Sequence, residues 1–193
     1  ETKMILPIRA FGDAVLRKHC HEIDKDYPGL NELISNMFET MESAHGIGLA
    51  APQIGLDIRL FIADLSPLAE DEDYADIADE LKDFKKVFIN AKILEESGEE
   101  WKFNEGCLSI PDIREDVKRK ETIVIEYYDE NFVKHTDTFS DMRARVIQHE
   151  YDHIEGILFT DHLSSLKKKL VKGKLVKISH GDVAVNYKMR FPK

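Results

Sequence analysis

The chain has 193 residues, of which 42% are hydrophobic and 33% charged, as is typical of a globular protein with a sizeable core. Its 27 Lys and Arg residues against 37 Asp and Glu residues give a net charge of −10, which argues against a DNA-binding protein. The sequence has no apolar run of the kind that forms a signal peptide or a membrane span, and its two cysteines do not make a disulfide framework. We therefore expect one domain over residues 1–193, in the cytoplasm and without membrane partners.

The N-terminal half contains one clear helix and one clear strand. Apolar residues recur at helical spacing from Leu30 to Met41, which predicts a helix that begins after Pro28-Gly29 and ends near His45-Gly46. A glycine-rich turn follows over residues 46–55, and residues 58–63 form a predicted strand.

Residues 64–83 are strongly acidic, with nine Asp or Glu residues and one Lys. Such a segment favours solvation over burial, so we expect an acidic surface insertion, a solvated loop with at most one exposed helical turn. A calcium site is the weaker alternative, because Asp71-Glu72-Asp73 lacks the glycine-centred ligand spacing of a calcium-binding loop.

The C-terminal half is rich in predicted strands. Period-two patterns and short apolar runs predict strands at 87–89, 122–128, 132–139 and 183–191. A short helix is predicted over Leu163 to Val171, with Gly173 near its end. We predict an α+β fold with mostly antiparallel sheets around a central metal-binding helix and with a C-terminal strand.

That helix carries Gln148-His149-Glu150-Tyr151-Asp152-His153, which contains the spacing His-Glu-x-x-His. Residues four apart lie on one face of a helix, so His149 and His153 can bind one metal ion. Glu150 then lies beside the open coordination position, where it can take a proton from a water molecule. The motif predicts metal-assisted attack of water on a carbonyl; the alternative is a solvated helix face with two histidines.

The boundaries of this helix are also marked in the sequence. Residues 138–141 resemble a capping box, and Gly156 follows the last predicted turn. Apolar residues from Met142 to Ile157 recur on one broad stripe, so the two histidines lie close to a buried face.

A catalytic metal site takes three protein ligands and leaves one position open. Downstream of the motif, the candidates for a third ligand are Glu155, Asp161 and His162. Upstream, Cys107 follows a glycine that allows close backbone approach. From the residues alone, Cys107 is either a metal ligand or a small buried hydrophobe.

Three segments together resemble the peptide deformylase family, in the order and spacing of that family's motifs, and the resemblance runs from about Ile5 to about His162. The segments are Gly46-Ile47-Gly48-Leu49-Ala50-Ala51-Pro52-Gln53, Glu105-Gly106-Cys107-Leu108-Ser109 and Gln148-His149-Glu150-Tyr151-Asp152-His153. The resemblance implies that Cys107, His149 and His153 hold one metal ion per chain, Fe²⁺ in the cell and replaceable by Zn²⁺ or Ni²⁺. Ligand type alone favours zinc.

The resemblance also implies the catalytic roles. Glu150 is implied as the general base and then the general acid. The side-chain amide of Gln53 and the backbone N–H of Leu108 are implied to stabilise the oxyanion. The reaction is removal of the formyl group from the N-terminal formylmethionine of a nascent chain, with release of formate.

On the substrate side, the resemblance implies contacts from Ile47, Gly48, Glu105 and Arg145. It also implies that Glu105 and Arg114 support the site as a buried ion pair. Arg145 stands where the family often has an apolar pocket residue, so side-chain preference in that pocket departs from the common pattern. The acidic segment is longer than the usual connection, and the alternating tail differs from members that end in a helix.

Three other functions use the same residues. A metalloprotease or aminopeptidase would use the same helix but take its third ligand from downstream. A binding protein with a structural zinc would have four protein ligands and no open position. A cysteine hydrolase would use Cys107 as a nucleophile.

Two clusters lie outside these motifs. His19-Cys20-His21 resembles a metal chelate, but adjacent residues of an extended chain point to opposite faces, so we expect no site there. The lysines from Lys167 to Lys177 are expected to form a solvated face. For an enzyme that acts on nascent chains, contact with ribosomal RNA is the alternative.

Overall fold

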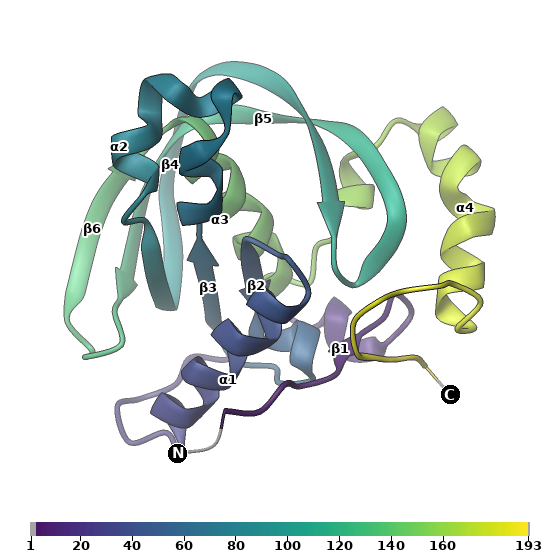
Figure 1. Ribbon diagram of the computed structural model, residues 1–193, viewed down its shortest axis with the longest axis horizontal. Helices are drawn as coiled ribbons and strands as arrows, with labels where there is room; N and C mark the ends of the chain where they lie inside the picture. The colour runs from purple at the N-terminus through teal and green to yellow at the C-terminus, as the bar shows by residue number, and fades with distance from the viewer. Residues whose placement is uncertain (1–2, 193) are drawn as a thin grey trace.

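The computed structural model describes residues 3–192, which form a five-stranded antiparallel sheet, a two-stranded parallel sheet and the helices that cover them (Figure 1). The large sheet has the order β2 (Gly48–Ala50), β3 (Leu60–Asp64), β4 (Lys85–Cys107), β5 (Ile110–Tyr128), β6 (Lys134–Phe139). The small sheet pairs β1 (Ile8–Arg9) with β7 (Met189–Arg190). The α-helices are α1 (Leu30–Ser43), α2 (Ala78–Leu81), α3 (Asp141–Ile154) and α4 (Ser165–Ser179). Short 3₁₀ helices are η1 (Ala14–Arg17), η2 (Ala51–Ile54), η3 (Ser66–Glu70), η4 (Glu72–Ile77) and η5 (Phe159–His162).

Helices α1 and α3 pack on opposite faces of the large sheet. Successive side chains of a strand point to opposite faces, and all five residues of β3 are buried. Ile62 packs in the cluster that contains the apolar face of α1, whereas Phe61 packs in the cluster that contains the apolar face of α3. The predicted α+β class and the predicted helices α1 and α3 are therefore confirmed.

The β4–β5 hairpin is far longer than predicted. Its pairing runs from Ile89 opposite Tyr128 to Cys107 opposite Ile110, and its irregularities include a register shift just before Cys107. The hairpin arches over one end of the molecule in Figure 1 and returns toward the centre. Its end carries Cys107 to the α3 face, which the short predicted strands at 87–89 and 122–128 could not do.

The acidic segment is not the solvated loop that the sequence predicts. It folds into η3, η4 and α2, and the side chains of Leu65 and Leu81 are fully buried. Tyr74 and Ile77 also pack against the core cluster of α3. Most of the acidic side chains are exposed, as expected, but a few apolar residues anchor the segment as an ordered cap.

Helix α3 begins and ends by different means. The predicted capping box is wrong: Ser140 takes the N-cap position without capping the helix through its side chain, which lies 2.9 Å from the hydroxyl of Thr122. Asp141 instead accepts a hydrogen bond from the Arg143 N–H at 3.0 Å. At the other end Gly156 has φ +75°, and a Cβ there would lie 2.6 Å from the Arg17 carbonyl oxygen, so only glycine fits this exit.

The C-terminal region differs from prediction in two ways. Helix α4 extends to Ser179 and passes through Gly173, because Val171 and Ile178 bury one side of it. The tail from 183 to 191 alternates between half-buried and exposed residues as predicted, yet only Met189–Arg190 forms a strand, since only this part meets β1. Among residues 3–192, none of the helices combines the length and the apolar character that a membrane span requires.

Candidate active site

Three potential metal ligands converge where α3 meets the end of β4. The ligand atoms of Cys107, His149 and His153 all lie within 4.8 Å of one another. The Sγ atom of Cys107 lies 3.4 Å from Nε2 of His153. A thiol and two imidazoles at this separation suit one divalent metal of the zinc or iron type. The structure thus brings together the three predicted metal ligands.

A buried carboxylate orients the first of the two imidazoles. Oε1 of Glu105 lies 2.9 Å from Nδ1 of His149, which leaves Nε2 of that ring for a metal. Glu105 also accepts hydrogen bonds from Arg119 Nε at 2.8 Å and from Arg145 Nη1 at 2.7 Å. Although burial raises the pKa of Glu105, the hydrogen bonds from His149 and Arg119 outweigh it and hold the pKa below its usual range. Glu105 is therefore an ionised carboxylate behind the metal site.

The predicted ion pair between Glu105 and Arg114 is wrong. Arg114 donates instead to Asn104, to Oδ1 from Nε at 3.0 Å and to the carbonyl oxygen from Nη2. The partner of Glu105 is Arg119, whose Nη1 atom also lies 2.8 Å from Oδ2 of Asp152. Positions 114 and 119 are an odd number apart on one strand, so their side chains point to opposite faces.

The downstream candidates for a third ligand are engaged elsewhere. Asp161 forms an ion pair with Arg17 at 2.6 Å, and His162 Nε2 lies 2.8 Å from Oδ2 of Asp152. Glu155 pairs with Arg59 and also with His19, whose side chain is exposed. These contacts leave Cys107 as the third member of the cluster.

Burial shifts the pKa values of His153 and Glu150. It lowers the pKa of His153 to about 3, so this imidazole is neutral and able to bind a metal. It raises the pKa of Glu150 to about 7, so this carboxyl can take up and release a proton near neutral pH. One oxygen of Glu150 and Nδ1 of His153 are buried without a hydrogen-bond partner among residues 3–192. The unpartnered oxygen of Glu150 beside the three ligand residues fits a site built to receive a metal and water.

Gly48 makes room for Glu150. A Cβ at position 48 would clash with the carboxylate of Glu150, so a residue with a side chain would displace that group. Gly48 is the first residue of β2, the edge strand of the large sheet. The glycine therefore brings an edge-strand backbone into direct contact with the acid of the metal motif.

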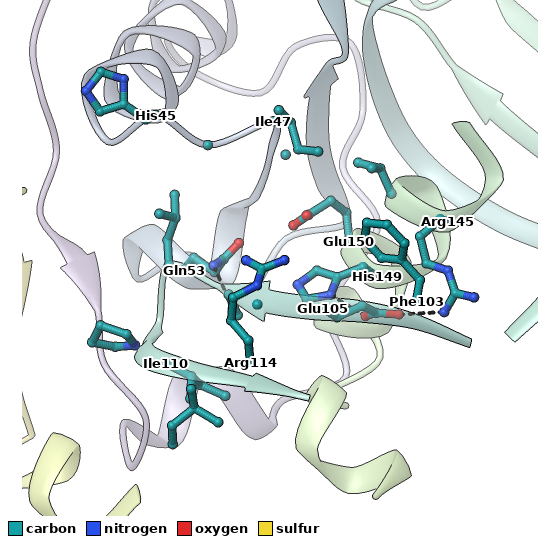
Figure 2. A pocket seen from close by; sticks show the side chains of 18 of the residues that line it. His45, Ile47, Gln53, Phe103, Glu105, Ile110, Arg114, Arg145, His149 and Glu150 are labelled. Carbon is teal, nitrogen blue, oxygen red and sulfur yellow. Dashed lines mark hydrogen bonds and ion pairs between the residues drawn. The ribbon is translucent and has the colours of Figure 1, made fainter. Parts of the chain in front are cut away.

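The amide of Gln53 is held by its surroundings. Its Oε1 accepts a hydrogen bond from the Ala50 N–H at 2.9 Å, which turns Nε2 toward the site. Nε2 lies 3.2 Å from Ser109 Oγ and 3.5 Å from Cys107 Sγ. Figure 2 shows Gln53 on one side of the pocket, with His149 and Glu150 facing it from the other. The side-chain amide of Gln53 is thus fixed and points into the space above the three metal-ligand residues.

Gln53, His149 and Glu150 line a cleft of about 750 Å³. Its other lining residues include Ile47, Gly48, Leu108 and Arg145. Arg145 is only 2% exposed. Its Nη1 atom donates to Glu105, its Nη2 atom donates to the Trp101 carbonyl at 2.6 Å, and its guanidinium lies 4.4 Å from the Trp101 ring. The charge of Arg145 is thus paired behind the cleft wall (Figure 2).

Sequence reasoning missed three residues around this site. Arg119 and Asp152 support the His149 side, but no local pattern separates Arg119 from the other basic residues of its strand. Tyr187 lies 79 residues away from Leu108 in sequence and donates a hydrogen bond to its carbonyl oxygen at 2.6 Å. The only signal for Tyr187 was the period-two alternation of the tail, which places it on the inner face.

Comparison with known proteins agrees with this geometry. A family model described as polypeptide deformylase matches residues 5–169. The chain is 63% identical over 190 residues to a peptide deformylase of Christiangramia forsetii, and the match covers 98% of this chain and 97% of that protein. It is 60% identical over 189 residues to a peptide deformylase of Flavobacterium johnsoniae, with coverage of 97% and 96%.

Solved structures show the same fold. A crystal structure of a peptide deformylase from Legionella pneumophila matches with a TM-score of 0.77 at 35% identity, over 92% of this chain and 96% of that one. The peptide deformylase structure from Thermus thermophilus matches with a TM-score of 0.77 at 38% identity, over 91% and 98%.

Proposed function

Because the chain belongs to the peptide deformylase family, metal-dependent hydrolases that remove the N-formyl group from nascent polypeptides, we propose specific roles for its residues in that hydrolysis. Cys107, His149 and His153 hold one divalent ion. The convergence of their ligand atoms within 4.8 Å is the observation that carries this assignment. When bound, the ion increases the acidity of water and polarises the formyl oxygen.

Glu150 moves the proton in this proposal. Its carboxylate accepts a proton from the attacking water, and the same group then donates that proton to the leaving amine. A pKa raised by burial to about 7 suits both steps, because the proton is neither held too tightly nor released too readily. The products are formate and a free N-terminal amine.

Gln53 and Leu108 stabilise the negative charge that develops on the formyl oxygen. The N–H of Ala50 donates to the side-chain oxygen of Gln53 and so holds the whole amide group in place. Nε2 of Gln53 is therefore already directed at the site before the reaction begins. No protein acceptor bonds the Leu108 N–H among residues 3–192, and this group lies in the turn that lines the cleft. The Leu108 N–H is thus available to a ligand, whereas Gln53 Nε2 donates to Ser109 Oγ and Cys107 Sγ and turns one of these hydrogens to the oxyanion in this proposal.

The substrate peptide adds to the free edge of β2. This strand pairs with β3 on one side, and its other edge opens toward the cleft at Gly48. An extended peptide can then bond to backbone groups there, with the formyl end directed at Glu150. We assign Ile47 and the aliphatic part of Arg145 to the wall of the side-chain pocket, and Glu105 acts through His149.

The metal in the cell is Fe²⁺ in this proposal, with Zn²⁺ and Ni²⁺ as replacements. A thiolate with two imidazoles accepts all three ions, so the ligand set supports each of them. Metal analysis of protein purified without oxygen tests the identity of the native ion. A protein that contains zinc alone, although iron was supplied and oxygen excluded, contradicts this assignment.

Substitutions of Cys107 test the ligand set. Cys107→Ser replaces a thiolate with a neutral hydroxyl and weakens metal binding, whereas Cys107→Asp restores part of the affinity because carboxylate oxygen also binds at close range. Activity recovers less than affinity, since the ligand changes the acidity of the bound water. If Cys107 is a nucleophile instead, metal content stays constant in both variants. Formate release and bound metal, measured side by side, separate the two mechanisms.

The choice of substrate is tested with matched peptides. Formyl-Met-Ala-Ser should release formate. Unformylated Met-Ala-Ser should remain intact, because the proposed reaction removes a formyl group and does not cleave the Met–Ala peptide bond. Cleavage of the unformylated peptide would instead favour the aminopeptidase alternative.

We also propose that α4 contacts ribosomal RNA in the cytoplasm. Five lysines of this helix are exposed, Lys168, Lys169, Lys172, Lys174 and Lys177, and exposed Leu166 and Leu170 lie beside them. Clustered lysines supply the phosphate contacts that dominate binding to RNA, even on an acidic protein. The triple substitution K168E/K169E/K172E should reduce the amount of protein that co-sediments with ribosomes, and it should make this binding less sensitive to salt concentration. Formate release from free peptides should not change. Unchanged co-sedimentation overturns this docking proposal only.

A further inference from the structure

The C-terminal tail contacts the turn that carries the proposed oxyanion donor. Tyr187 donates its hydroxyl hydrogen to the Leu108 carbonyl oxygen at 2.6 Å. Burial raises the pKa of Tyr187 above its ordinary value, so the hydroxyl is protonated and acts as the donor. The ring packs in the core cluster that contains α1.

The tail is itself fixed next to this tyrosine. The carbonyl oxygen of Lys188 accepts a hydrogen bond from Ile8 at 2.9 Å, and that of Arg190 accepts one from Ala10 at 3.0 Å. These bonds belong to the β1–β7 pairing. The position of the Tyr187 hydroxyl is therefore set by backbone pairing on one side and by ring packing on the other.

The turn from Cys107 to Ile110 is held at two successive carbonyls. Tyr187 holds the carbonyl of Leu108, and the N–H of Phe11 donates to the carbonyl of Ser109 at 2.9 Å. The two ends of the turn pair with each other in the hairpin. The Leu108 N–H lies in the peptide plane before the Leu108 carbonyl, so the Tyr187 contact reaches it through the two torsions of Leu108. Because the Cys107–Ile110 pairing holds one side of these torsions and the fixed carbonyls hold the other, rotation of the Leu108 N–H is restricted.

We propose that Tyr187 is a positioning residue for deformylation: its hydroxyl fixes the Leu108 turn so that the Leu108 N–H meets the formyl oxygen beside Cys107. The inference rests on the proposed oxyanion role of the Leu108 N–H. It assigns a function in catalysis to a tail that lies outside the three sequence motifs.

Tyr187→Phe tests the proposal, because it keeps the ring and its packing and removes only the hydroxyl. Tyr127→Phe is a matched control: Tyr127 also donates from a hydroxyl at 2.6 Å, to Asp137 on the far strands of the sheet. Each variant loses one hydrogen bond, and because the bond to the Asp137 carboxylate is the stronger, Tyr127→Phe should lose at least as much stability as Tyr187→Phe. A difference between them in catalysis then reports on position rather than on folding.

Steady-state kinetics of metal-loaded protein give the first readout. Tyr187→Phe should lower kcat about tenfold, leave KM unchanged within about twofold and retain the metal, because an interaction of the transition state is misplaced. Tyr127→Phe should retain wild-type kcat. Hydrogen–deuterium exchange of metal-free protein gives a second readout that needs no activity: the segment 107–110 should exchange faster in Tyr187→Phe than in Tyr127→Phe.

Three outcomes overturn the proposal. They are a kcat for Tyr187→Phe within twofold of wild type, a rise in KM alone, or a fall in kcat with unchanged exchange at 107–110. The exchange result does not depend on which group binds the oxyanion. Wild-type kcat in Gln53→Ala would instead count against the proposed oxyanion site itself.

Discussion

Oε1 of Glu105 lies 2.9 Å from Nδ1 of His149, and this contact connects the metal-ligand residues to the buried charged side chains behind them. The same carboxylate receives two arginines, Arg119 and Arg145, while Arg119 also reaches Asp152. A ring held through Nδ1 has a fixed tautomer and orientation, so the ligand is preorganised before a metal arrives. The metal site is thus supported by a network of buried charges behind His149.

Glu105→Gln should weaken metal binding about 10- to 100-fold, because the amide no longer stabilises His149 as a metal ligand. The free energy of unfolding should also fall by about 3 kcal/mol, since buried Arg145 loses its counter-charge and Arg119 keeps only Asp152. Chelator competition measures the first effect and urea denaturation the second. Glu115→Gln is the control: Glu115 lies opposite Glu105 on β5 but pairs with Lys167 near the surface. Equal metal affinity in the two variants would contradict the supporting role of Glu105.

Asp161→Asn should leave metal content unchanged and cost up to about 1 kcal/mol of stability at pH 7. Burial raises the pKa of Asp161, but hydrogen bonds from Arg17 and from the Leu158 N–H outweigh it, so the pKa lies below its ordinary value. A lowered folded-state pKa stabilises the fold above the unfolded pKa of about 4, and this stability is lost as pH falls through the folded value. The difference between wild type and variant should therefore shrink below about pH 4. Loss of the metal from this variant would instead restore Asp161 as a ligand.

Leu81→Ala should destabilise the protein by about 2–5 kcal/mol, although it lies in a segment that resembles a solvated loop in sequence. Its side chain is fully buried under the acidic cap. Glu80→Ala, one position earlier and exposed, should change stability by less than about 0.5 kcal/mol. Thermal and urea unfolding of the two variants provide the comparison. Similar stability of both would show that the cap does not anchor the core.

The elements that the sequence predicted correctly are those with a periodic apolar pattern. Helices α1 and α3 each bury a stripe at helical spacing, and β3 is one short apolar run. Most of the β4–β5 hairpin was missed because residues such as Glu95 and Lys118 face solvent from both strands, so hydrophobic alternation is weak there. The acidic segment was misjudged because a few apolar anchors decide its packing while the many charged residues decide its composition.

The candidate site shows the same division. The relative positions of His149, Glu150 and His153 follow from the spacing of residues on one helix, and this spacing can be read from the sequence. The choice of Arg119 over Arg114 as the partner of Glu105 depends on strand register across a long hairpin, and the contact of Tyr187 depends on where the tail crosses the molecule. Neither relationship has a local signature, so only the folded chain reveals them.

The most direct test of the account is Glu150→Gln loaded with the same metal as the wild type. The amide cannot accept the proton of water, while Cys107, His149 and His153 remain in place. Bound metal should stay at one ion per chain, and kcat for formate release from a formyl-methionyl peptide should fall by about 10²- to 10⁴-fold. A metal-loaded Glu150→Gln protein that releases formate at the wild-type rate would contradict the proposed mechanism.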